Sequence, residues 1–320
     1  MPHVTLVIGT QNIYQLVSAL QHAEQGGSRV ITSLADSYDI PRFLPNFSAD
    51  SPAPPFRKFI TIMQGCNNFC SYCVIDEARV LVENGVKELT LLGQNVNSYG
   101  KTNSVVLGKK RGEYGFARLL GDVAELADQG LQRLRFTTSN PKDLTDELIA
   151  CFADIDILCP QLHLPVQAGS DRVLKRMNRR YSIADYLELV DKLHKVCPAI
   201  ALTTDIIVGF PGEPEEVKSA RLTRFQQRQD EISLERNREY IGKVQKIMLE
   251  PELDSALLSR GRTESNHIVH LQQPVAAVPG DIIAVKITGA GQHSLQGSVM
   301  ENNNTEYSAA GRELLQYDTI

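Results

Sequence analysis

The residues of this sequence with the clearest chemical potential are three cysteines, Cys66, Cys70 and Cys73, in the segment GCNNFCSYC. Their close spacing lets one loop wrap around a single inorganic cluster. Three thiolates leave one iron of a [4Fe-4S] cluster without a protein ligand, and that iron can bind the amino and carboxylate groups of S-adenosylmethionine. Transfer of one electron to the sulfonium then releases a 5′-deoxyadenosyl radical. The motif therefore predicts a cluster that cleaves S-adenosylmethionine.

A structural zinc site is the alternative hypothesis for the same cysteines. Structural zinc usually has four Cys or His ligands, and no further Cys or His follows Cys73 at the usual spacing. The chain has 6 cysteines, too few for a disulfide scaffold at this length. Cys151, Cys159 and Cys197 stand apart from the triplet, and we expect them to be buried or incidental thiols. We favour the iron–sulfur cluster.

The elements around the triplet alternate between strand-like and helix-like patterns from residue 56 onward. The predicted strands are KFITIM, KELTLLG, RLRFTTS, QLHLPV and AIALTTDIIVGF, and the predicted helices are DEARVLVENG, FARLLGDVAELADQG, DLTDELIACFA and IADYLELVDKLHKV. Such alternation is typical of a parallel α/β sheet or barrel. The cysteine triplet directly follows the first of these strands, where ligands bind in such folds.

On the same argument, polar residues at the ends of the later strands should line the cofactor and substrate pocket. Taken singly, each is better explained as a turn or cap residue than as a ligand, and only the set as a whole indicates a pocket. We expect His163, inside the apolar run QLHLPV, to be a hydrogen-bonded core residue, and we assign no catalytic residue. The predicted cofactor-binding residues are Gln94, Asn95, Ser139, Gln167, Gly209 and Glu213, with Gly93, Asn140 and Ser170 beside them.

The flanking segments predict two smaller parts. The first 56 residues start with a strand-like VTLVIG and a helical QNIYQLVSALQHA, then become rich in Ser, Pro and Asp, as in a linker. Residues 215–242 form a polar helical pattern typical of a solvent-facing connector. The short strand candidates VQKIMLE, NHIVHL, DIIAVKITGA and SLQGSVM follow, and they predict a small β-barrel.

The composition limits the partners. The formal net charge of −5 argues against nonspecific binding of nucleic acid. Basic residues cluster locally, at 109–111 and at Lys175, Arg176, Arg179 and Arg180, which leaves open either a phosphate-contacting face or a solvated helix end. No apolar run approaches the roughly 20 residues that span a bilayer, and the first residues lack the features of a secretory signal. We expect a cytoplasmic protein with no membrane partner.

Several blocks of the sequence resemble the radical S-adenosylmethionine methylthiotransferases, and in particular those that make 2-methylthio-N6-dimethylallyladenosine in tRNA. The resemblance covers most of residues 57–243 and is carried by FITIMQGCNNFCSYCVI, VKELTLLGQNVNSYG, LRFTTSNPKDLTDELI, CPQLHLPVQAGSDRVLKRMNRRY, TTDIIVGFPGE and DEISLERNREYIGK. LLSRGRTESNHIVHL and SLQGSVM resemble a TRAM domain, a small RNA-binding β-barrel.

The resemblance implies an incomplete radical SAM partial barrel at 57–239, a TRAM-like domain at 240–320, and a remnant of the family's N-terminal domain with a linker at 1–56. It implies that Cys66, Cys70 and Cys73 hold a [4Fe-4S] cluster, that S-adenosylmethionine is the second cofactor, and that the nucleoside at tRNA position 37 is modified. It also implies an electron donor such as flavodoxin or ferredoxin. We expect a monomer.

The sequence departs from the family pattern in ways that bear on activity. No cysteine precedes Cys66, so the three cysteines of the family's second, sulfur-donating cluster are not found. A basic stretch after CSYCVI, and a helix and the sixth strand after FPGE, are missing, which should leave about five strands and an exposed sheet edge. Asn140 stands where the family has histidine. A catalytically inactive tRNA-binding remnant is therefore the alternative function.

Overall fold

The computed structural model describes residues 4–9, 12, 15–26, 30–32, 55–63, 71–101, 105–106, 109–110, 114–137, 139–210, 215–251 and 257–300. The chain forms two compact units, Met1–Asn46 and Phe47–Ile320. In the first, β1 (Val7–Ile8) pairs in parallel with β2 (Val30–Ile31), and α1 (Leu16–Glu24) lies between them in the sequence. The expected helix over 11–23 thus begins about one turn later than its apolar pattern predicts.

The second unit contains the five expected parallel strands. Strands β3 (Arg57–Thr61), β4 (Glu88–Leu92) and β7 (Arg133–Phe136) form one sheet in that order, and β8 (Gln161–His163) pairs with β9 (Ala201–Thr203). A bridge between Leu134 and Leu158 continues the pairing beyond β7. Among the described residues β9 pairs only with β8, and Ile206 and Ile207 beyond it are exposed. Within the described residues, β9 is therefore an edge strand.

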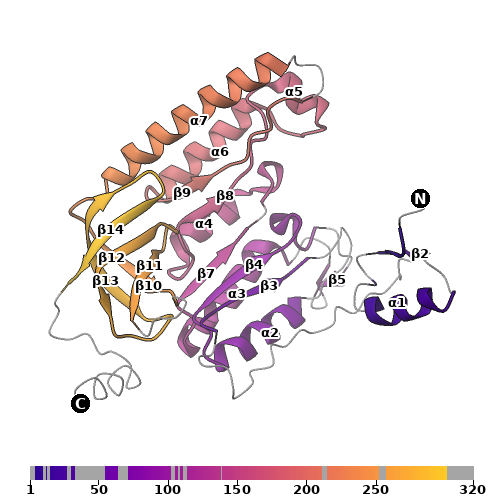
Figure 1. Ribbon diagram of the computed structural model, residues 1–320, viewed down its shortest axis with the longest axis horizontal. Helices are drawn as coiled ribbons and strands as arrows, with labels where there is room; N and C mark the ends of the chain where they lie inside the picture. Colours follow the sequence, from indigo (N-terminus) through magenta and orange to yellow (C-terminus); the bar gives the residue numbers. More distant parts are fainter. Residues whose placement is uncertain are drawn as a thin grey trace. The chain divides into compact units, whose positions relative to one another are not determined.

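Helices α2 (Ser71–Glu83), α3 (Phe116–Ala124), α4 (Asp146–Asp154) and α6 (Ile183–Val196) cover the apolar face of these strands (Figure 1). Leu119, Leu120 and Val123 of α3 are completely buried, as their spacing predicts. The α-helix ends at Ala124 and continues as a 3-10 helix, Glu125–Gln129, which Gly130 ends with a φ of 114°. The core thus follows the expected periodicity.

Helix starts in this unit are fixed by side chains. The Thr145 hydroxyl accepts a hydrogen bond from the Leu148 N–H at the start of α4. Ser182 and Asp185 form a capping box at the start of α6, in which each side chain binds the other residue's backbone N–H. Smaller elements complete the unit: α5 (Asp171–Arg176), 3-10 helices Val96–Ser98 and Pro141–Asp143, and the antiparallel pair β5 (Val105–Val106) and β6 (Lys109–Lys110).

The long helix α7 (Glu215–Arg238) leads to a closed five-stranded barrel. The helix is mostly exposed, as its polar pattern predicts. The barrel order is β10-β11-β12-β14-β13, with β10 at Val244–Leu249, β11 at Leu258–Thr263, β12 at Ile268–Val275, β13 at Ile282–Ala290 and β14 at Ser294–Val299. Strand β11, LSRGRT, is absent from the predicted strands because its polar residues and Gly261 obscure the pattern. A Cβ at Gly261 would lie 2.7 Å from the Met248 carbonyl oxygen, so the backbones of β11 and its neighbour β10 approach each other too closely here for a larger side chain.

Charged side chains join the barrel to the sheet. Arg57 on β3 forms a 2.8 Å ion pair with Glu250, which follows β10. Arg133 and Arg135 on β7 each donate a 2.8 Å hydrogen bond to a barrel carbonyl, of Arg262 and Glu264 respectively. Arg57 and Arg133 are the first residues of β3 and β7, so the barrel packs against the amino-terminal edge of this sheet. None of the described helices is both long and apolar enough to cross a bilayer.

We expect Glu250 to make stability pH-dependent. Burial alone would raise the pKa of this carboxyl, but hydrogen bonds from Arg57 and Arg262 outweigh burial and lower the pKa below its ordinary value. The Glu250 contribution is therefore complete above the unfolded pKa of about 4.3 and is lost as pH falls through the lower folded value. In urea titrations at several pH values, the deficit of Glu250→Gln relative to the wild type should shrink below about pH 4. A deficit that is independent of pH would contradict this assignment.

Candidate functional site

The cysteine loop joins the carboxyl end of β3 to the start of α2. Strand β3 ends at Thr61 and α2 begins at Ser71. Cys66 and Cys70 lie outside the described residues, whereas the backbone of Cys73 lies in the first turn of α2. The positive end of a helix dipole favours thiolates and an anionic cluster, so this position suits the predicted metal ligands. Across the described ranges, no other group of three His, Cys, Asp or Glu side chains could hold a metal ion.

The ends of β4 and β7 are tied together by asparagine side chains. The Asn97 amide donates to the Asn140 carbonyl at 2.9 Å, and the Asn140 N–H donates to Asn97 Oδ1 at 3.0 Å. Asn95 Nδ2 donates to Asp143 at 2.7 Å, while Gln94 is exposed to solvent. Two of the strand-end residues predicted from the sequence, Asn95 and Asn140, therefore link the segment after β4 to the segment after β7.

Two polar atoms of this structure are buried without a hydrogen-bond partner among the described residues. They are Asn95 Oδ1 and Ser139 Oγ. Buried polar atoms are nearly always satisfied by protein, water or a ligand. Asn95 and Ser139 follow adjacent strands on the same edge as the cysteine loop, so the two atoms fit the polar groups of a cofactor bound there.

The ends of β8 and β9 are joined by backbone contacts of Gln167. Its φ of 68° is left-handed, its N–H donates to the Asp205 carbonyl, and its carbonyl accepts from the Ile207 N–H. Gly209 also has a positive φ of 81°, and a Cβ there would meet the Lys218 side chain at 2.7 Å. Glu213 lies outside the described residues. Gln167 and Gly209 thus shape the loops beyond this pair of strands.

His163 is hydrogen-bonded, as expected, but it is half-buried at the edge of the core rather than inside it. Its side chain is 26% exposed, its Nδ1 lies 3.0 Å from Thr203 Oγ1, and its Nε2 lies 3.4 Å from Asp205 Oδ2. Leu162 and Leu164 on either side are buried in the helix-covered face. Since side chains alternate along a strand, His163 belongs to the opposite, polar face, and this alternation in QLHLPV was the signal that could have placed it.

The isolated cysteines are structural. Cys151 and Cys159 are buried, and burial raises the pKa of each thiol to about 11. Cys197 is half-buried, and burial raises its pKa as well. A raised pKa keeps less of a thiol in the reactive thiolate form. Cys151 and Cys159 are thus buried thiols, as expected, and Cys197 lies partly exposed.

Comparison with known proteins gives a consistent picture. A family model described as the Radical SAM superfamily matches residues 60–222. The chain is 47% identical to the tRNA-2-methylthio-N(6)-dimethylallyladenosine synthase of Desulfotalea psychrophila, with 94% of this chain and 78% of the relative aligned. Proteins with the same name from Geotalea uraniireducens and Geobacter sulfurreducens are each 37% identical, over 93% and 94% of this chain and 78% and 77% of their own lengths.

The alignments also show internal differences. The alignment with the Desulfotalea protein runs over 357 positions, more than the 320 residues of this chain. The relative therefore carries segments that this chain lacks between the aligned blocks. This agrees with the internal omissions inferred from the sequence.

Proposed function

The chain belongs to the radical SAM superfamily and, within it, to the family of tRNA-2-methylthio-N(6)-dimethylallyladenosine synthases, and on this premise we propose that it acts on tRNA by radical chemistry. The proposed substrate is N6-dimethylallyladenosine at position 37, next to the anticodon, and the proposed product is its 2-methylthio derivative. The observation that carries the proposal is the three-cysteine motif at the carboxyl end of β3, inside the region that the superfamily model matches.

The residues Cys66, Cys70 and Cys73 would hold a [4Fe-4S] cluster, which together with S-adenosylmethionine supplies the radical that removes hydrogen from C2 of the adenosine. The protein's own part is to position the cofactor and substrate. Asn95 and Ser139 offer buried hydrogen-bonding atoms at the edge where the cysteine loop begins. Gln94, Gln167, Gly209 and Glu213 complete the proposed cofactor-binding set, since they follow the neighbouring strands of the same edge.

Other parts of the chain have proposed roles of their own. The open arrangement of β3, β4, β7, β8 and β9 supports an incomplete radical SAM barrel over 57–239. The closed five-stranded barrel supports a TRAM-like RNA-binding domain over 240–320. Residues 1–56 would be the remnant of an N-terminal domain. A monomer that receives electrons from a flavodoxin or ferredoxin and meets tRNA in the cytoplasm fits this assignment.

The alternative function, an inactive tRNA-binding remnant, is favoured by one observation. The Desulfotalea relative carries internal segments that this chain lacks. A chain that makes the radical need not insert sulfur. Radical generation and sulfur insertion must therefore be measured separately.

The test is an anaerobic assay of the chain reconstituted with iron and sulfide. The substrates are S-adenosylmethionine, a reductant, and tRNA that carries N6-dimethylallyladenosine, and the products are separated by chromatography and mass spectrometry. We expect 5′-deoxyadenosine together with the 2-methylthio nucleoside. Deoxyadenosine without the methylthio product would restrict the function to radical generation, and tRNA binding without either product would select the inactive remnant.

A further inference from the structure

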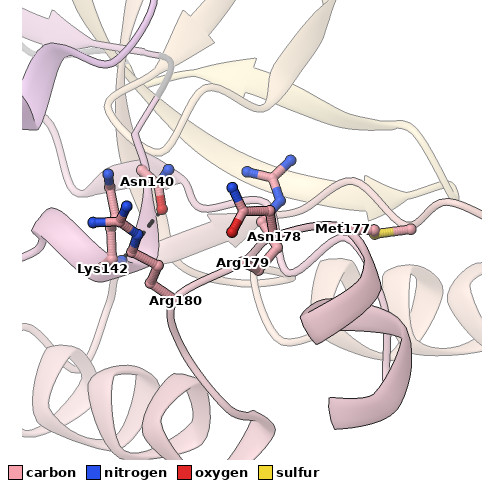
Figure 2. Close-up of a pocket in the computed structure, with 6 residues that line it drawn as sticks. All are labelled: Asn140, Lys142, Met177, Asn178, Arg179 and Arg180. Carbon is pink, nitrogen blue, oxygen red and sulfur yellow. Dashed lines mark hydrogen bonds between the residues drawn. The ribbon is translucent and has the colours of Figure 1, made fainter.

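A basic cavity lies beside the candidate site, and its basic side chains have no role in the function proposed above. Its volume is about 280 Å³, and the side chains that line it come from two separate segments (Figure 2). The first segment follows β7 and the second follows α5. The lining residues are Asn140, Lys142, Met177, Asn178, Arg179 and Arg180.

The cavity carries three cations and little compensating charge. In Figure 2, Lys142 and Arg180 point toward Asn140, and Arg179 extends beside Asn178. Asp143 Oδ2 lies 3.8 Å from Lys142 Nζ, and Asp143 Oδ1 also binds Lys101 Nζ at 2.8 Å. The described part of the chain places no carboxylate at ion-pair distance from Arg179 or Arg180. Three neighbouring cations on a chain of net charge −5 indicate an anionic ligand.

The loop that presents the two arginines is held in place at both ends. Asn178 has a left-handed φ of 56°, and the Arg179 N–H donates to the Leu174 carbonyl, which closes the end of α5. Behind them the buried Tyr181 donates its hydroxyl to the Val166 carbonyl at 3.1 Å. A loop fixed in this way keeps its cations together before the ligand arrives, which reduces the entropic cost of binding.

We propose that this cavity is a phosphate-binding subsite that holds one backbone phosphate of the RNA substrate beside the reacting nucleoside. The inference rests on the proposed action on tRNA and adds the contact that positions the RNA. Asn140 connects the two sites. It lines the cavity, and its carbonyl accepts a hydrogen bond from Asn97, which follows β4. A phosphate bound here would therefore lie next to the proposed reaction centre, on the same edge of the sheet.

The carboxylate of S-adenosylmethionine is the competing anion, and charge argues against it. That cofactor carries a sulfonium and an ammonium against one carboxylate, so a cavity with three cations repels the molecule as a whole. An RNA backbone has one negative charge per nucleotide and gains from every cation it meets. Arginine in addition matches two phosphate oxygens with two parallel N–H donors. The cavity therefore suits a phosphodiester.

The test compares RNA binding by the full chain and its variants. The probe is an anticodon stem–loop oligonucleotide containing N6-dimethylallyladenosine, and fluorescence anisotropy gives its Kd across a series of salt concentrations. Arg180→Gln and Lys142→Gln should each weaken binding about tenfold, as expected for a charged hydrogen bond. Each should also lower the slope of log Kd against log salt by about 0.7–0.9. The matched control, Arg228→Gln on exposed α7, should bind like the wild type.

Two further arms make the outcome specific. Neutral methylphosphonate linkages replace the phosphates of the oligonucleotide one at a time. At the position that occupies the cavity, the replacement should raise the Kd of the wild-type protein. It should not raise the Kd of Arg180→Gln any further. The Kd for S-adenosylmethionine, measured on reconstituted protein by equilibrium dialysis, should be the same in the wild type and both variants. Wild-type affinity for RNA in both variants, or a selective loss of S-adenosylmethionine binding, would overturn the subsite but not the proposed function. A wild-type chain that fails to bind the RNA would overturn both.

Discussion

Replacing Cys70 with alanine is expected to abolish cluster binding and 5′-deoxyadenosine formation together. The three-cysteine motif offers three thiolates for a cluster that already has one iron without a protein ligand. Without Cys70, two irons of the cluster lack a protein ligand, and the cluster is held too weakly to survive purification. Iron analysis after anaerobic reconstitution should fall from about four iron atoms per chain to a small fraction of that, and the deoxyadenosine assay should fall to background.

The control for this experiment is Cys197→Ala. Cys197 is a half-buried free thiol outside the motif, and its replacement should leave iron content and deoxyadenosine formation unchanged. Retention of wild-type iron in Cys70→Ala would reject the assignment of the motif. Zinc in place of iron in protein purified without oxygen would select the structural zinc hypothesis.

The sequence predicts most of the elements that position the candidate site because their patterns are local. The apolar stripe of α3, the Thr145 cap of α4 and the left-handed Gly130 each depend on residues a few positions apart. The five strands were recognisable because apolar runs end in polar residues. The order of elements places their carboxyl ends on one edge, which is why the sequence predicts that Asn95 and Ser139 lie near each other.

Contacts between distant segments were not predictable in the same way. Arg179 and Arg180 form a basic cluster that is visible in the sequence, but the position of Lys142 beside them is not, since α4, β8 and α5 intervene. The partial exposure of His163 was missed for a different reason. Two leucines beside it made the segment look uniformly buried, although alternation along β8 turns the histidine to the polar face.

The burial of charged side chains in the sheet was also not predictable from the sequence. Glu88, Arg133 and Arg135 lie in strands whose other face is fully apolar, and all three are buried. Isolated charges in a strand usually indicate a solvated face. Here they are covered instead by the barrel, which follows more than 100 positions later in the sequence. The link between the two folded parts is thus made of polar residues.

Glu88 is the centre of this link. Its Oε1 lies 2.8 Å from Arg57 Nε, and its Oε2 lies 3.4 Å from Arg135 Nε and 3.9 Å from Arg133 Nη1. The Glu88 side chain is only 3% exposed. Burial lowers the pKa of the Arg133 guanidinium below its ordinary value, and the Glu88 carboxylate opposes this effect. Of these three arginines, Arg57 alone also forms an ion pair with Glu250.

Glu88→Gln should therefore destabilise the chain by about 3–5 kcal/mol, the usual cost of removing one partner of a buried ion pair. The change keeps the size of the side chain but leaves buried guanidinium groups without their counter-charge. Urea unfolding measures the effect, and Glu231→Gln is the matched control because its ion pair with Arg228 on α7 is exposed. That control should cost well under 1 kcal/mol. If the two variants unfold at the same urea concentration, the buried network does not hold the barrel to the sheet.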